Sequence, residues 1–127
     1  MASGVISREG YYKPGDTFST AANMALFVPG IITSSSGLYI GCFTVDKSLA
    51  AISSISITSL TGALRGTNGY VDSTADSTNL ITKYSNIKMY KISDYNVKVD
   101  INKGSAFSNV TNNTPVILCC KMTIAFS

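Results

Sequence analysis

The chain has 127 residues, 45% of them hydrophobic and only 13% charged, with a formal net charge of +3. This length suits a single domain, and the scattered lysines and arginines form no basic run that could follow a nucleic-acid backbone. No apolar stretch reaches the roughly 18 residues of a membrane helix, and the N-terminus lacks the pattern of a signal peptide, so we expect neither membrane insertion nor signal-directed secretion.

The first half of the chain contains four segments with the composition of β-strands. In chain order they are Asp16–Ser19, Leu26–Thr33, Leu38–Val45 and Ile52–Leu64. Pro29 and Gly30 interrupt the second segment, which we therefore expect at a sheet edge or at a bulge. The third is apolar on both faces and is predicted to be a central strand. Two further stretches each have room for one short helical turn, Thr20–Leu26 and Asp46–Ala51.

The second half contains three more such segments, Ile87–Ile92, Val97–Ile101 and Val116–Phe126. The last gives the strongest signal because six apolar side chains alternate along it: Val116, Leu118, Cys120, Met122, Ile124 and Phe126. Ile117 and Cys119 make part of its other face apolar, so we expect that face to be partly covered. The segment Val97–Ile101 alternates between apolar and polar residues, as strands of an antiparallel sheet with one wet face do.

Seven or eight short strands separated by turn clusters predict an all-β fold, either an antiparallel β-sandwich or a jelly roll. One turn cluster contains Asn68-Gly69, a dipeptide that readily forms a tight hairpin. We expect residues 1–127 to form a single β-sandwich domain, with residues 1–10 as a candidate extended N-terminal arm. Several strands are apolar on both faces, and a lone domain would leave one such face in water. We therefore predict a homo-oligomer and favour a trimer.

Three cysteines, Cys42, Cys119 and Cys120, cannot all form disulfides within one chain. Adjacent residues on a strand point to opposite faces, so we expect neither a bond between Cys119 and Cys120 nor a metal clamp. We interpret all three as buried free thiols of a chain made in a reducing cytoplasm. Zinc is not expected, because the chain has no histidine.

The residue types needed for catalysis are scarce. Without histidine, only lysine is left to activate a serine or threonine, and no Gly-x-Ser-x-Gly turn occurs. The close acid pair, Asp72 and Asp76, lies in a polar stretch where loop solubility explains it better than calcium binding does. The glycines around Thr67 suggest a hairpin rather than a phosphate-binding loop. We therefore predict a binding or structural domain that is not an enzyme and needs no cofactor.

Polar and aromatic side chains gather around the predicted hairpin and along the polar stretch Asp72–Asn79 that follows it. A tyrosine ring can stack on a sugar, and cations, amides and carboxylates nearby can hydrogen-bond to its hydroxyls. Binding domains commonly carry their recognition residues on such loops. The candidate ligand-binding residues are Arg65, Asn68, Tyr70, Asp72 and Asn79. The alternative interpretation is a solvated hairpin that binds nothing.

Three short words occur in order along most of the chain: EGYYKPGDT at Glu9–Thr17, LRGTNGY at Leu64–Tyr70 and VTNNTP at Val110–Pro115. Together they make the chain resemble the C-terminal receptor-binding modules, or knobs, of tail-fibre-like proteins from phages of Gram-positive gut bacteria. The resemblance implies a β-rich, usually homotrimeric knob at the far end of a fibre that touches the bacterial surface. It carries over no catalytic residue. No shaft or tail-anchoring region precedes these words, so we expect an excised tip or a short virion protein that uses the same fold.

The resemblance further implies a virion protein, made in the host cytoplasm, that attaches to a bacterial surface glycan or protein. Its expected partners are copies of itself, the host surface and other virion proteins. The alternative is a structural virion subunit, such as a capsid fibre, decoration or tail protein, without ligand-binding activity. A third class, a polysaccharide depolymerase, would need a cleft with paired carboxylates, which the seven acids do not offer in recognisable form.

Overall fold

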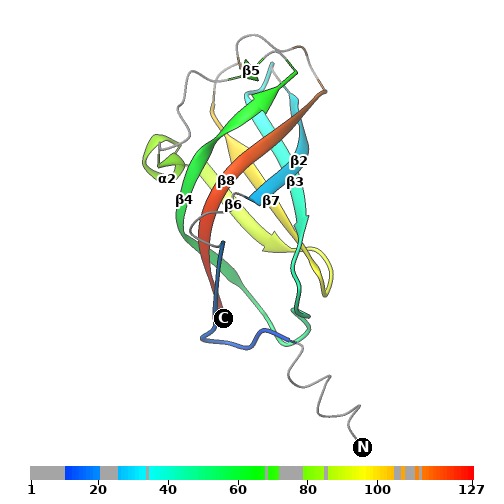
Figure 1. The fold of residues 1–127 in the computed structure, drawn as a ribbon, viewed down its shortest axis with the longest axis vertical. Coiled ribbons are helices and arrows are strands. Elements are labelled where there is room, and N and C mark those ends of the chain that lie inside the picture. Colours follow the sequence, from blue (N-terminus) through cyan, green and yellow to red (C-terminus); the bar gives the residue numbers. More distant parts are fainter. Residues whose placement is uncertain are drawn as a thin grey trace, which may run out of the picture.

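The computed structural model describes residues 11–20, 26–33, 35–67, 69–71, 79–84, 86–104, 107, 111 and 113–127. In this part of the chain eight strands form one sheet, in the order β5-β4-β8-β2-β3-β7-β6, with β1 paired to β8 outside that order. Every pairing between these named strands is antiparallel. The sheet curls until β6 at one end contacts β4 near the other, which encloses the core (Figure 1). The prediction of an antiparallel all-β fold is confirmed.

The described elements follow the predicted segments closely. The strands are β1 (Thr17–Ser19), β2 (Leu26–Thr33), β3 (Leu38–Thr44), β4 (Ile55–Gly66), β5 (Gly69–Tyr70), β6 (Asn86–Lys91), β7 (Asn96–Asn102) and β8 (Thr114–Phe126). One short helix, α2 (Leu80–Lys83), was not predicted. Of the two expected helical turns, residues 46–51 form no helix but bends, a turn and an isolated bridge from Ser48 to Tyr11. Residues 21–25 lie outside the described residues, as does the candidate arm at residues 1–10.

β8 organises the sheet, as the strength of its sequence pattern suggests. It pairs with β4 along one edge and with β2 and β1, one after the other, along the opposite edge. In Figure 1 it crosses the middle of the molecule in orange and red. Its six alternating apolar side chains are at most 3% exposed: Val116, Leu118, Cys120, Met122, Ile124 and Phe126. They form the centre of the core against the facing half of the curled sheet.

The expectation that β2 lies at a sheet edge or at a bulge is wrong, because β2 lies between β8 and β3. It pairs with β8 from Leu26 to Ile32 without a register shift, whereas its pairing with β3 begins only at Gly30. Pro29 therefore precedes the ladder to β3, and its missing N–H interrupts no bond to that strand. The predicted central position of β3 is confirmed, since it lies between β2 and β7.

Beyond the end of the ladder between β2 and β3, the buried side chain of Tyr39 on β3 contacts the main chain of β2. Its hydroxyl donates to the Val28 carbonyl oxygen at 2.8 Å, and burial raises the pKa of that hydroxyl. Gly30 and Gly41 leave room for the ring. A Cβ at Gly41 would collide with the Tyr39 hydroxyl, and a Cβ at Gly30 would lie 2.8 Å from ring atom Cε2. The neutral tyrosine thus links β3 to β2 inside the core.

Aromatic side chains close the end of the sheet near the C-terminus. Tyr12 packs against Phe126 and Phe18, with ring centroids 4.6 and 6.1 Å away, and Phe18 stacks on Phe43 at 6.3 Å. The Tyr12 hydroxyl donates to Asp46 Oδ1 at 3.2 Å. Burial, together with the negative charge of Asp46, raises the pKa of Tyr12 to about 12. This cluster ties the segment before β1 to the core.

Candidate binding surface

Six side chains on β2 and β8 form a continuous apolar surface on the outside of the sheet. The strand register sets them opposite one another as Phe27 with Cys119, Pro29 with Ile117 and Ile31 with Pro115. The intervening residues of both strands, such as Val28 and Leu118, point into the core. Because side chains alternate between the faces of a strand, the six lie together on the opposite face. We call them the outer apolar surface.

Three residues of the outer apolar surface are among the most exposed large hydrophobic residues of the described chain. Phe27 is 63% exposed, and Ile31 and Ile117 are each 42% exposed. A scattered exposed isoleucine is ordinary in soluble proteins, but a contiguous apolar patch is characteristic of a binding surface. On adjacent β3, the partly buried Ile40 pairs with Ile31 and extends the patch.

A groove of about 600 Å³ opens over the outer apolar surface. Phe27, Pro29, Ile117 and their neighbours line one part of it, and the β4–β5 hairpin contributes Arg65, Gly66 and Thr67. Arg65 is directly opposite Ile117 in the β4–β8 register, which explains how the hairpin comes to border the groove. The groove therefore combines an apolar wall with a guanidinium and a hydroxyl.

The structure brings only part of the predicted ligand-binding set to this groove. Arg65 lines it and is exposed, and its partner in the β4–β5 ladder is Tyr70. The hairpin closes with the pair Gly66 and Gly69, so a hairpin forms at the predicted turn cluster, but Gly69 of the predicted Asn68-Gly69 dipeptide belongs to the ladder and not to the turn. Asn68 and Asp72 lie outside the described residues, so their place in the set stays a prediction.

Asn79 has a structural task in the described chain. It is the N-cap of α2, and its side-chain Oδ1 accepts a hydrogen bond from the Ile81 main-chain N–H at 3.1 Å. It also forms an isolated bridge with Thr61 of β4. N-capping is a well-known preference of asparagine, and it explains this residue without a ligand. The polar stretch was interpreted as loop, so this capping role was missed.

Phe27, Pro29 and Pro115 were not recognised as candidate binding residues, although the sequence contained a signal for their face. The apolar Ile117 and Cys119 on the second face of β8 indicated partial covering. Alternation along β8 places Pro115 on the same face as Ile117. The register between β2 and β8, which sequence alone did not fix, is what adds Phe27 and Pro29 to that face.

The interpretation of all three cysteines as buried is right only for Cys120, which is 2% exposed. Cys42 and Cys119 are partly exposed, because each takes an outward position on its strand. All three are free thiols, and Cys119 and Cys120 point to opposite faces as predicted. Burial raises the pKa of the Cys120 thiol to about 12.

The outward face of β6 and β7 is polar and contrasts with the outer apolar surface. The Tyr90 hydroxyl donates to Asp100 Oδ2 at 3.1 Å, and Lys98 Nζ lies 5.6 Å from the centroid of the Tyr90 ring. A hydrogen bond with Tyr90 and the charge of Asp100 raise the pKa of Lys98. Polar side chains therefore occupy this face, although the buried Oδ1 of Asp100 has no hydrogen-bond partner among the described residues.

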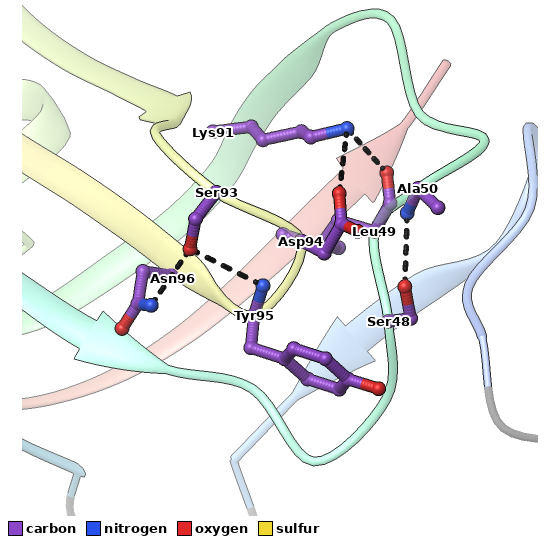
Figure 2. Close-up of polar contacts among 8 residues, drawn as sticks. All are labelled: Ser48, Leu49, Ala50, Lys91, Ser93, Asp94, Tyr95 and Asn96. Atoms are coloured by element: carbon purple, nitrogen blue, oxygen red, sulfur yellow. Dashed lines mark hydrogen bonds and ion pairs between the residues drawn. The ribbon is translucent and has the colours of Figure 1, made fainter.

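The turn between β6 and β7 carries two further exposed apolar residues, Ile92 at 52% and Tyr95 at 50%. Polar contacts tie this turn to the loop after β3 (Figure 2). Lys91 Nζ donates to the Leu49 carbonyl oxygen at 2.9 Å and lies 3.7 Å from Asp94 Oδ1. Ile92 and Tyr95 thus belong to a fixed turn rich in polar groups, not to an apolar surface.

Within the described residues, no group of three or more His, Cys, Asp or Glu side chains is arranged to hold a metal ion. No helix in the described part of the chain is long and apolar enough to cross a membrane.

Comparisons of the chain with family models, curated proteins and solved structures find no match. The groups that line the groove offer apolar contact, hydrogen bonding and one positive charge, which are means of non-covalent binding.

Proposed function

We propose that this chain is a non-catalytic tip module of a phage fibre, which attaches to a glycan or protein on the bacterial surface. The observation that carries the proposal is the groove between the β4–β5 hairpin and the outside of β2 and β8. Its volume of about 600 Å³ lies within the range of roughly 300–1,000 Å³ typical of ligand pockets.

The chemistry of the groove suits a sugar or a peptide. Phe27 presents an exposed aromatic ring on which an apolar ring face or side chain can stack. Arg65 and Thr67, on the opposite wall, supply a guanidinium and a hydroxyl for polar groups of the same ligand. The predicted ligand-binding residues Asn68 and Tyr70 belong to the same hairpin segment. In the assembled trimer that we propose, this hairpin end faces the host.

The proposal is tested by adsorption of the purified, fluorescently labelled protein to a panel of Gram-positive gut isolates. We expect saturable binding to at least one strain, competed by unlabelled protein. Arg65→Gln should weaken it about ten- to hundredfold, because hydrogen bonds to a charged group contribute about 1.5–3 kcal/mol. The matched control, Lys88→Gln, removes an exposed positive charge from β6 and should leave adsorption unchanged.

Two outcomes would count against this function. If the labelled protein showed saturable binding to none of the strains, an adhesion role would be contradicted. Equal loss in Arg65→Gln and Lys88→Gln would show that net charge, not the groove, controls adsorption.

The second candidate function is a structural virion subunit, such as a capsid fibre, decoration or tail protein. The contiguous apolar area on β2 and β8 favours it, because such an area suits a permanent protein neighbour as well as a ligand. In this case the particle itself would cover the hairpin end, and labelled protein would bind to no cell.

A further inference from the structure

We infer that the ligand of the groove is a protein segment that places an acidic side chain next to a large apolar one. The inference deepens the proposed function, which leaves a glycan and a protein open, and it rests on that function in taking the groove as the site of host attachment. It depends on the composition of the groove lining and on the charge along the groove border.

The lining of the groove offers much apolar contact and few hydrogen bonds. Among its ten described residues, only Arg65 and Thr67 have side chains that form strong hydrogen bonds. The main chain of β8 beneath the groove pairs with β2 on one side and with β4 on the other. A sugar carries several hydroxyls, and burying them without partners is costly. The lining therefore favours apolar side chains of a protein over the hydroxyl-rich surface of a glycan.

Two exposed side chains in the groove are suited to hold an apolar anchor residue. Phe27 is 63% exposed and Ile117 is 42% exposed, and the strand register makes them diagonal neighbours on β2 and β8. Pro29, directly opposite Ile117, completes an apolar corner. In protein interfaces a few buried anchor residues, aromatic ones above all, carry most of the binding energy. The partner residue expected at this corner is therefore a large apolar one.

The border of the groove carries positive charge. The exposed Arg65 lies opposite Ile117 on β4, and the exposed Lys121 follows Cys119 by two positions on the outward face of β8. None of the four described aspartates lines the groove, and the whole chain has a net charge of +3. Because charges across an interface are generally complementary, we expect an acidic side chain in the ligand, next to its apolar anchor.

The experiment pans a library of short random peptides against the purified protein of residues 1–127, which measures ligand preference without any cell. Enriched peptides are expected to place an aspartate or glutamate next to a phenylalanine, tryptophan, leucine or isoleucine. A synthetic peptide of the enriched sequence should bind about tenfold more weakly to Phe27→Ser and, independently, to Lys121→Glu. The matched controls, Ile92→Ser and Lys88→Glu, should bind as the wild-type protein does. All four positions are exposed, so every variant should keep a cooperative melting transition.

Treated cells distinguish a protein ligand from a glycan. Protease treatment of a strain that the labelled protein binds should abolish saturable adsorption. Periodate, which oxidises neighbouring hydroxyls of sugars, should leave adsorption unchanged. Loss with periodate but not with protease would overturn the inference and leave the proposed function intact.

The peptide experiment has its own contradicting results. No enrichment, or enrichment of peptides without acidic residues, would overturn the inference. So would a loss of peptide binding in Ile92→Ser and Lys88→Glu as large as that in Phe27→Ser and Lys121→Glu. Enrichment as expected, without adsorption to any cell, would contradict the proposed function alone.

Discussion

Replacing Tyr39 by phenylalanine removes one hydroxyl and leaves the buried ring in place. That hydroxyl donates to the Val28 carbonyl oxygen at 2.8 Å, at a point where β2 has no ladder partner in β3. Leaving a buried acceptor without its donor costs about 1–3 kcal/mol. Because small domains have a net stability of about 5–15 kcal/mol, Tyr39→Phe should lower the free energy of unfolding by a readily measured fraction.

Urea denaturation of both proteins, followed by fluorescence or circular dichroism, measures this difference. The midpoint should fall while the slope of the transition stays unchanged, since the same surface is exposed on unfolding. Tyr90→Phe is the control, because its hydroxyl donates to Asp100 on the exposed face of the sheet. A Tyr39→Phe midpoint no lower than that of Tyr90→Phe would refute the view that the buried hydroxyl holds β2 to β3.

Three further predictions concern other parts of the fold. Gly62→Ala should destabilise the protein by the order of 1–3 kcal/mol in the same assay, because φ at Gly62 is +152° and a Cβ would collide with the Cys119 carbonyl. An unchanged midpoint would contradict this. The pKa of Tyr12, raised to about 12, lies above the value near 10 of an unfolded tyrosine. The stabilisation that the neutral Tyr12 hydroxyl provides is complete below pH 10 and is lost between pH 10 and about 12. The melting temperature of Tyr12→Phe should therefore fall less over this range than that of the wild-type protein. A thiol reagent at pH 8 should modify Cys42 before Cys120, whose pKa is raised to about 12 by burial. Equal modification rates in the folded protein would show that the core opens at β8.

Alternation of side chains along each strand was enough to predict most of the fold. The predicted segments Val116–Phe126 and Val97–Ile101 correspond to β8 and β7. The alternating apolar side chains of both strands face the core, as expected. The position of β2 was mispredicted because Pro29 is normally an edge signal. The interruption is tolerated since pairing to β3 starts one residue later, a long-range detail that local sequence does not encode. The short helix α2 begins at Asn79, which is its N-cap. An asparagine in a polar stretch is equally typical of an ordinary loop, so the helix was not predicted.

The candidate site was predicted only in part. Arg65 was identified because it stands beside a recognisable hairpin turn, and it does line the groove. Phe27 could not be identified from sequence, since its exposure follows from the register that places it opposite Cys119. A single apolar residue in a strand is equally compatible with either face. Only the pairing of two strands far apart in the chain turns separate apolar residues into a surface.

The most direct test of the central claim is the location of this chain in the native particle, determined by electron cryomicroscopy. Our account predicts three copies around a threefold axis at the free end of a fibre. In that arrangement the β4–β5 hairpins, and the groove that they border, point toward the host. A chain within the particle wall, with the hairpin end and Arg65 covered by neighbouring subunits, would contradict it.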